Sequence, residues 1–389
     1  MLKLKKILAD HGIEQAALAD ASGYSAPTMS QLLNHGFWPR SAKSRRLRDN
    51  IRGYLRMRGV AESLIAVAFE KETAPVQEGP DTNLSDEEPM SIPKQILHPN
   101  TRQHFGLVRD PFGEVSSAEE FYQNEHIRFT RAAMVDAARR GGFLAVVGES
   151  GSGKTTLRRD LQERIDREQL PIQVIRPYVV GMEANDVTGK TLKAAHILEA
   201  IMAEIAPHDP LRMSQNARFR QLETALRESY SAGQRCVVVI EEAHALPKPT
   251  LRHFKRFIEL EDGFKRLLSV ILVGQPELLT KVDPRDPTMR EVVQRLEIIK
   301  LPPLGHYLEE YVAHRVEPLG VPVDKIITVD GLQAVRDRLQ PPAPRGHEQR
   351  SYLYPLAVHN LMIAAMNLAA ENGAPCVSAD IVKEVTWAR

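Results

Sequence analysis

An eight-residue run, Gly148 to Thr155, constrains this chain more than any other part of its sequence, because it matches G-x-x-x-x-G-K-[ST] at every fixed position. The apolar residues 143–147 predict a β-strand before this run, and the residues from Thr156 onward predict a helix after it. Glycine lets the main chain curl until its N–H groups surround a phosphate, and the following helix adds the positive end of its dipole. The pattern therefore predicts a P-loop that binds a nucleotide. A Gly/Ser-rich turn that matches by chance is the alternative.

Individual side chains of this loop have predicted roles. We expect Lys154 to reach the β- and γ-phosphates and the Thr155 hydroxyl to hold Mg²⁺, so the expected cofactors are ATP and Mg²⁺. The residues expected to bind the nucleotide are Gly148, Glu149, Ser150, Gly151, Ser152, Gly153, Lys154, Thr155 and Thr156.

A second run, residues 237–242, consists of four apolar residues followed by Glu241 and Glu242. Nucleotide hydrolysis needs a metal ion and an activated water, and both can be served by carboxylates at the end of a strand beside the P-loop strand. We expect Glu241 to lie near the Mg²⁺ ion as a metal-site residue, and Glu242 to orient or deprotonate the attacking water. The alternative is an ordinary buried strand with charged residues where it reaches the surface.

Residues 105–304 alternate between strand-like and helical runs, which predicts a parallel sheet with crossover helices. Residues 305–389 are helical throughout, as in a lid subdomain. The expected fold class is therefore α/β, with a P-loop parallel sheet and a helical lid. The expected strands are 172–175, 236–240 and 267–273, and the expected helices in the core are 118–140, 192–205, 217–231 and 250–260.

The net charge of +1 hides a basic N-terminal segment. Residues 1–60 carry eleven Lys and Arg side chains against four acids, which suits a polyanionic partner. Two short helices joined by a turn at Gly23 predict a helix-turn-helix, whose second helix begins at Ser25. We therefore expect a small all-α helix-turn-helix domain at residues 1–65. A helical bundle that binds protein is the alternative.

Residues 66–104 are acidic and rich in proline, which predicts a linker between this domain and the core. The two cysteines, Cys236 and Cys376, have no metal-ligand spacing around them and favour a reducing, cytoplasmic setting. The longest apolar stretch, residues 361–370, is too short to cross a bilayer, so no membrane partner is expected.

Four motifs together resemble one group of AAA+ ATPases, which contains the phage Mu B protein, TnsC, TniB, IstB and the ExeA-like ATPases. These motifs are the P-loop, the run Ile-Glu-Glu-Ala-His at 240–244, the run Leu-Val-Gly-Gln-Pro-Glu-Leu at 272–278, and Arg295-Leu296 followed by Leu-Pro-Pro-Leu at 301–304. The resemblance covers about residues 105–389. Residues 1–65 resemble the DNA-binding domain of lambda-repressor-like proteins, and this architecture is most similar to that of the Mu B transposition protein.

The resemblance implies roles for matching positions only. Gln275 would be the sensor of the γ-phosphate or the water, and Arg295, or else Arg290, the arginine finger inserted into a neighbouring subunit's site. Residues of both types are also commonplace at such positions. Glu241 stands where the group usually has Asp, and no basic residue occupies the start of the helix at 355 where a second sensor arginine is often found. Arg345 and Arg350 lie just upstream and have no assigned role.

The resemblance also implies contacts with DNA. Exposed side chains of the second helix would face base edges or phosphates, and basic side chains would add phosphate contacts. Solvated basic faces balanced by nearby acids are the alternative. The candidates are Ser25, Thr28, Ser30, Gln31, Lys43, Arg45, Arg46, Arg48, Lys190, Lys193, Lys248, Arg252, Lys255 and Arg256.

The expected function is that of an ATP-dependent ATPase of DNA transposition. It would assemble as a homo-oligomer, a ring or helical filament, on double-stranded target DNA and recruit or stimulate a transposase. An ATP-switched helix-turn-helix transcription regulator is the alternative. A secretion ATPase of the ExeA-like kind is a third interpretation, which the absence of an apolar membrane-spanning run disfavours.

Overall fold

The computed structural model describes two compact units, residues 1–86 and residues 87–389, each considered by itself here. In the larger unit it describes residues 93–177, 193–342 and 351–386. In the smaller unit it describes residues 4, 7, 8, 11, 13, 15–23, 29, 32, 33, 43–61, 64, 65, 68 and 69, apart from the side chains of 16, 20 and 43–46.

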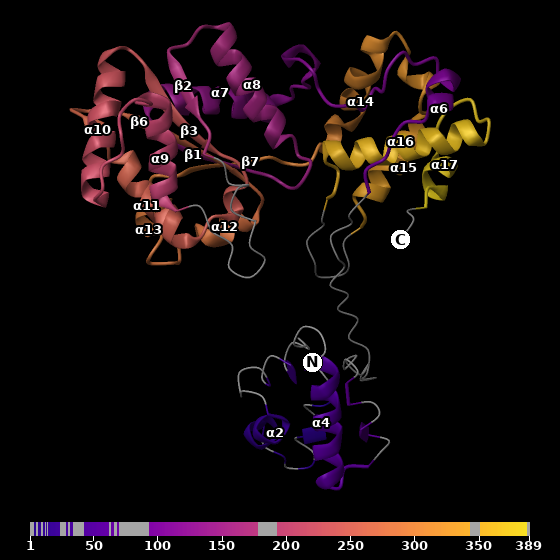
Figure 1. Cartoon of the computed structure of the whole chain (residues 1–389). Helices are drawn as coiled ribbons and strands as arrows, with labels where there is room; N and C mark the ends of the chain where they lie inside the picture. Colours follow the sequence, from indigo (N-terminus) through magenta and orange to yellow (C-terminus); the bar gives the residue numbers. More distant parts are fainter. Residues whose placement is uncertain are drawn as a thin grey trace. The chain divides into compact units, whose positions relative to one another are not determined.

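The described elements follow one another in the order drawn in Figure 1. The smaller unit contains helices α2 (Gln15–Ser22) and α4 (Lys43–Met57). The strands of the larger unit are β1 (Phe143–Val147), β2 (Ile172–Ile175), β3 (Arg235–Ile240), β4 (Glu261–Asp262), β5 (Lys265–Arg266), β6 (Leu268–Gly274) and β7 (Glu297–Lys300). Its α-helices are α6 (Pro99–His104), α7 (Glu125–Arg140), α8 (Lys154–Arg167), α9 (Ala194–Ile205), α10 (Gln215–Ser231), α11 (Lys248–Ile258), α12 (Glu277–Lys281), α13 (Arg290–Val293), α14 (Leu308–Val316), α15 (Val329–Leu339), α16 (Pro355–Glu371) and α17 (Ala379–Glu384). Short 3₁₀ turns include η1 (Ala118–Glu120) and η3 (Ala243–Ala245).

Five strands form one sheet in the order β2-β3-β6-β1-β7, and all neighbours pair in parallel. The prediction of an α/β fold with a parallel sheet is therefore confirmed. One detail was wrong: β3 does not lie beside the P-loop strand β1, because β6 pairs with both of them. Strand β7 was not predicted, because it is an edge strand whose residues are mostly exposed and so lack the apolar run of a central strand.

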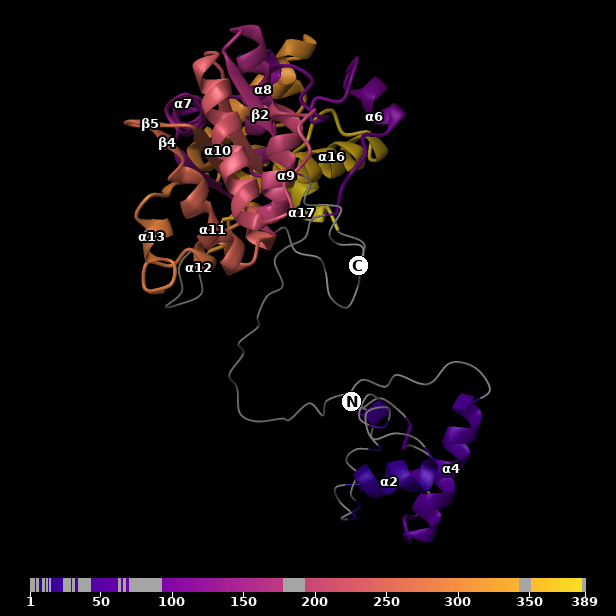
Figure 2. The ribbon, with the colours of Figure 1, turned by 60° about the vertical axis from the view of Figure 1, so that its left-hand side comes forward.

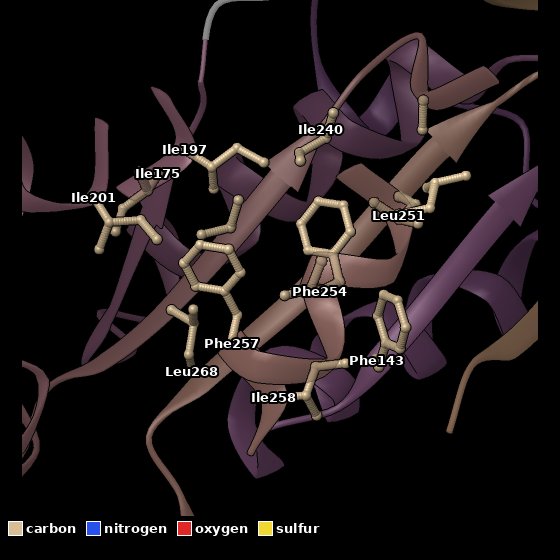
Figure 3. Packing of buried hydrophobic residues seen from close by; sticks show 14 of the residues in the cluster. Phe143, Ile175, Ile197, Ile201, Ile240, Leu251, Phe254, Phe257, Ile258 and Leu268 are labelled. Atoms are coloured by element: carbon tan, nitrogen blue, oxygen red, sulfur yellow. The ribbon is translucent and has the colours of Figure 1, made fainter. Parts of the chain in front are cut away.

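Alternate side chains of the strands enter two separate cores, so the sheet is the middle of three layers. On one face, Phe143 and Ile240 pack with residues of α9, α10 and α11, including Phe254 and Phe257 (Figure 3). On the other face, Leu144 and its neighbours pack against α7 and α8. Figure 2 shows α9 and α10 side by side on the first face. Burial on both faces explains why the central strands β1, β3 and β6 are almost entirely apolar, apart from Arg235 at the start of β3 and Ser269 of β6, whose hydroxyl donates to the Ala138 carbonyl.

The N-terminal part of the predicted helix 118–140 is not α-helical. Residues 118–120 form the 3₁₀ turn η1, and α7 begins only after Asn124, whose side-chain oxygen accepts a hydrogen bond from the Ile127 N–H at 2.9 Å. Asn124 is thus an N-cap that fixes the helix start. Phe121 and Tyr122, which come between η1 and α7 in the chain, are buried.

A helical part follows the sheet, and a segment from before the P-loop packs into it. Helices α14 to α17 share their core with Leu97, Phe105 and Phe112. Residues 99–104, within the range predicted as linker, form α6 beside α16 (Figure 1). Asn367 of α16 holds this segment, since its Oδ1 accepts from the Thr101 hydroxyl at 2.8 Å and its Nδ2 donates to the Ile96 carbonyl at 2.9 Å.

The smaller unit has a core of its own. Leu47, Ile51 and Leu55 lie one turn apart on α4 and are fully buried, together with Leu18 of α2. The predicted second helix of the helix-turn-helix falls largely outside the described residues. Across the described parts of both units, no helix combines the length and apolar character needed to cross a bilayer.

Helices α7 and α8 are joined by a buried ion pair. Arg131 donates from Nε and Nη2 to the two carboxylate oxygens of Asp160, each at 2.6 Å. Only 5% of the Asp160 side chain is exposed. Two parallel hydrogen bonds to a buried carboxylate make a geometrically specific contact between α7 and α8, the helix that follows the P-loop.

We expect Asp160→Ala to lower the free energy of unfolding of the full chain by about 3 kcal/mol, because it leaves the Arg131 guanidinium, only 14% exposed, without its partner. Urea denaturation measures this change. Asp136→Ala is the control: it breaks an exposed pair with Arg140 and is expected to cost at most about 0.5 kcal/mol. Equal losses in the two variants would contradict the structural role of the Arg131–Asp160 pair.

Candidate functional site

Three neighbouring strands end at one cavity. The P-loop follows β1, Glu242 follows β3, and Gln275 follows β6, which lies between the other two strands. The Gly148 N–H continues the β1–β6 pairing by donating to the Gly274 carbonyl at 3.1 Å. The cavity has a volume of about 660 Å³. The predicted site residues that line it are Ser150, Gly151, Ser152, Gly153, Lys154, Thr155, Thr156, Glu242 and Gln275.

The loop needs glycine at the two pattern positions, 148 and 153, and also at 151, for different reasons. Gly151 and Gly153 have left-handed backbone conformations, with φ of +74° and +94°. A Cβ on Gly148 would lie 2.5 Å from the Ser152 hydroxyl oxygen, and one on Gly151 would lie 2.3 Å from the Cβ of Leu356 in α16. The loop is therefore closely packed between the sheet and the helical part.

Lys154, the first residue of α8, is folded over the loop. Its ammonium group donates to the carbonyls of Gly148 and Glu149, both at 2.7 Å. Burial lowers the pKa of Lys154, while the nearby carboxylates of Glu242, Glu149 and Glu277 act in the opposite direction. The side chain thus places a cation among oxygens at the floor of the cavity, where phosphate oxygens can replace the loop carbonyls.

Whether the loop can hold an anion can be judged from the Ser152 hydroxyl. It is buried and has no hydrogen-bond partner among the described residues. An unsatisfied buried hydroxyl costs free energy unless a ligand supplies an acceptor. Together with the N-terminus of the 14-residue helix α8, this donor makes the loop suitable for phosphate oxygens.

The two acids after β3, Glu241 and Glu242, have different surroundings. Glu242 has a left-handed backbone, with φ of +50°, and lines the cavity. Glu241 is outside the cavity lining and forms an ion pair with Arg158 of α8. Arg158 was not predicted as a site residue, although its position one turn after Lys154 puts both cations on the same side of the helix. The Arg158 side chain is 12% exposed and that of Glu241 41%.

A third side chain, His244 of η3, lies between Glu242 and Gln275. Its Nδ1 is 3.4 Å from the backbone nitrogen of Gln275, which donates to it. Its Nε2 is 3.6 Å from a carboxylate oxygen of Glu242. The histidine belongs to the motif at 240–244, but its contact with the end of β6 depends on strand order and could not be read from sequence.

The far side of the cavity is lined by the helical part and by residues that precede the P-loop. Phe112, Ile127 and Ile363 contribute apolar surface there. Arg315 of α14 donates to the carbonyls of Pro111 at 2.8 Å and Gly113 at 2.5 Å and so joins the two segments. None of these residues was predicted to belong to the site.

A partly buried histidine, His359 of α16, lines the same wall. The Tyr311 hydroxyl hydrogen-bonds His359 Nε2, and burial lowers the pKa of His359 to about 3. Its imidazole is therefore neutral near neutral pH. Helix α16 thus supplies no cation where a second sensor arginine is often found.

Other predicted residues lie away from the cavity. Arg295 pairs with Glu259 at 2.9 Å, and Arg290 is exposed on α13. Lys248 pairs with Asp286 at 2.8 Å and Lys255 with Glu291 at 2.6 Å, so two of the cations on α11 already have acidic partners. Lys193, Arg252 and Arg256 are exposed and do not line the cavity either. Arg48, which belongs to the smaller unit, is exposed as well.

Several predicted positions fall outside the described residues. The residues concerned are Ser25, Thr28, Ser30, Gln31, Lys190, Arg345 and Arg350, together with the side chains of Lys43, Arg45 and Arg46.

Comparisons with known proteins agree with the site. Residues 137–282 match the family model described as an AAA domain. A relative, the general secretion pathway protein A of Aeromonas hydrophila, is 31% identical over 254 residues, which cover 62% of this chain and 42% of that protein. The chain thus spans less than half the length of this relative.

Solved structures that are partly similar to this chain share little of its sequence. Cdc6p from Pyrobaculum aerophilum is 17% identical with a TM-score of 0.48, covering 73% of each chain. The RuvB Holliday junction branch migration motor of Thermotoga maritima is 17% identical with a TM-score of 0.37, covering 70% of this chain and 72% of that one. The family match and the P-loop geometry lead to one conclusion: the chain contains an AAA domain, binds ATP and is an ATPase.

Gly151→Ala is expected to weaken ATP binding about tenfold, because the new methyl group meets Leu356 and the backbone is held at positive φ. Titration with a fluorescent ATP analogue measures this change. Gly373→Ala is the matched control: φ is +65° there but no atom lies within 4 Å of the new Cβ, so we expect a stability loss of about 1 kcal/mol and unchanged affinity. Unchanged affinity in Gly151→Ala would contradict the close packing of the loop.

Proposed function

We propose that this chain is an ATP-dependent DNA-binding ATPase of DNA transposition. In this proposal it assembles as a homo-oligomer on double-stranded target DNA, and the assembly recruits or stimulates a transposase. The observation that carries the proposal is the union of an AAA nucleotide site with a second compact unit built on a basic helix. An ATP-dependent change in oligomeric state would join these two parts of the molecule functionally.

We assign separate roles in ATP hydrolysis to the residues that line the cavity. Lys154 and the loop N–H groups would bind the β- and γ-phosphates, and Glu242 would orient or deprotonate the attacking water. Gln275, on the adjacent strand end, would contact the same water or the γ-phosphate. Both side chains line the cavity with the loop, as these roles require.

Mg²⁺ fits this site as a companion of the nucleotide. Across the described residues no group of three or more His, Cys, Asp or Glu side chains is arranged to hold a metal. Magnesium needs only one or two protein oxygens when phosphates and waters supply the rest. Thr155 lines the cavity and would give one such oxygen; Glu241 would act near the metal after releasing Arg158. When bound, Mg²⁺ would neutralise phosphate charge.

The smaller unit supports the DNA-binding part of the proposal. Helix α4 buries Leu47, Ile51 and Leu55 on one side and exposes Arg48 and Arg56. A helix with a buried apolar face and a basic outer face suits contact with phosphates. Lys43, Arg45 and Arg46 belong to the same helix, and we propose Ser25, Thr28 and Gln31 as further DNA contacts.

In the AAA part, DNA contacts are proposed for four further cations, Lys190, Lys193, Lys248 and Arg252. Lys248 would have to exchange Asp286 for a phosphate, and an exposed pair of this kind is weak enough to be exchanged.

Oligomerisation is proposed because Arg295 is separate from its own chain's cavity. Its side chain is 35% exposed and pairs with Glu259 of α11. An arginine that acts on a γ-phosphate must lie near one, so Arg295 would serve a neighbouring subunit's site.

A secretion-related ATPase is the second candidate function. The observation that favours it is the 31% identity to general secretion pathway protein A. The two candidates differ in one property that can be measured directly, which is ATP-dependent binding to double-stranded DNA.

We expect ATP to assemble the wild-type chain into oligomers on random-sequence duplex DNA, seen by electron microscopy and gel shift. Lys154→Ala should fail to assemble, because it loses a main phosphate ligand. Glu242→Gln should assemble and persist, because ATP binds but is hydrolysed at least roughly a hundredfold more slowly. If the chain does not bind DNA, with or without ATP, the transposition function is excluded and the secretion-related one is favoured.

Mixing variants tests the shared site. We expect Arg295→Ala and Lys154→Ala each to hydrolyse ATP poorly alone, and their equimolar mixture to regain up to about a quarter of wild-type activity, since hybrid interfaces combine an intact loop with an intact arginine. Arg290→Ala mixed with Lys154→Ala is the matched control for the alternative finger. If no mixture exceeds the sum of its components, the site is not completed by a second subunit.

A further inference from the structure

His244 occupies a position between the two side chains to which the proposed function assigns the γ-phosphate chemistry. Glu242 follows β3 and Gln275 follows β6, and η3 carries the imidazole between the two strand ends. One ring nitrogen, Nδ1, accepts from the Gln275 N–H at 3.4 Å. The other, Nε2, lies 3.6 Å from Glu242 Oε2.

The contact with Gln275 selects the tautomer of the ring. A main-chain N–H can only donate, so Nδ1 must be the acceptor and carries no proton. In the neutral imidazole the proton is then on Nε2, which faces the Glu242 carboxylate. The ring therefore presents a donor to the acid and an acceptor to the sensor strand at the same time.

The turn that carries His244 is held firmly in place. Lys281 of α12 donates through Nζ to the carbonyls of His244 and of Leu246, the second at 2.9 Å. Gly274 at the end of β6 lies so close that a Cβ there would be 3.1 Å from the His244 nitrogen. The His244 side chain is 21% exposed, whereas that of Glu242 is 56% exposed. The imidazole is thus the fixed member of the pair and the carboxylate the freer one.

We propose that His244 is a positioning residue for ATP hydrolysis, which directs the Glu242 carboxylate through Nε2–H and ties it through Nδ1 to the main chain of Gln275. This inference rests on the proposed role of Glu242. At 3.6 Å the Nε2–carboxylate contact is longer than a hydrogen bond, and such contacts shorten when substrate completes the site. The expected result is a fixed spacing between Glu242, which activates the water, and Gln275, which senses it.

Two substitutions separate the two halves of this bridge. Glutamine places its amide nitrogen near the position of Nε2 and can still donate to Glu242, whereas asparagine reaches only the Nδ1 position and keeps the contact with Gln275. We expect His244→Asn to lower kcat about tenfold with unchanged KM for ATP, and His244→Gln to stay within about threefold of wild type. Steady-state ATPase assays on the full chain provide both constants, and ADP affinity checks that each variant is folded.

The control variant is Lys281→Met, which loosens the turn but leaves the imidazole in place. If it reproduces the kinetics of His244→Asn, the histidine acts only through the turn, and the proposal is overturned. Wild-type kcat in His244→Asn, or equal losses in the Asn and Gln variants, would overturn it as well. Glu242→Gln is assayed in parallel: retained hydrolysis there refutes the proposed role of Glu242, whereas lost hydrolysis with normal kcat in His244→Asn refutes only the role of His244.

Discussion

The parallel pairing of β6 with both β1 and β3 is the constraint on which the rest of this structure depends. Its register places Val147 opposite Gly274, and the Gly148 N–H extends the same ladder by one more bond before the chain turns away into the loop. Because parallel strands all end at one edge, this pairing brings the P-loop, Glu242 and Gln275 together. A different strand order would separate the phosphate ligands from the acid without changing any local motif.

The helical part forms the second wall of the site. Leu356 of α16 donates its N–H to the Gly151 carbonyl at 3.3 Å and fills the space that a side chain at Gly151 would need. Arg315 of α14 holds the backbone at Pro111 and Gly113. A nucleotide in this cavity would touch the sheet, the residues that precede the P-loop and the helical part together, so its binding would be sensitive to how these parts pack.

The sequence predicted the elements whose local pattern is strong and failed where tertiary context decides. The largely apolar sequences of the buried strands β3 and β6, and the short β-type run of the edge strand β2, allowed these three strands to be predicted to within about one or two residues. Strand β7 was missed because an exposed edge strand carries no such pattern. The predicted helix at 118–140 was too long because helix propensity does not reveal the N-cap at Asn124. Likewise Arg158 and His244 were missed as members of the site, since their partners come from other strands and helices.

By itself the sequence determined the chemistry of the phosphate loop, because the loop's ligands are its own backbone and a lysine within the same eight residues. It also determined that two carboxylates follow a buried strand. Only the tertiary structure decided that these carboxylates separate, with Glu241 held by Arg158 and Glu242 beside His244 and the cavity. The physical reason is that the left-handed turn at Glu242 and the insertion of β6 between β1 and β3 are set by packing across the whole sheet, which no local run of residues encodes.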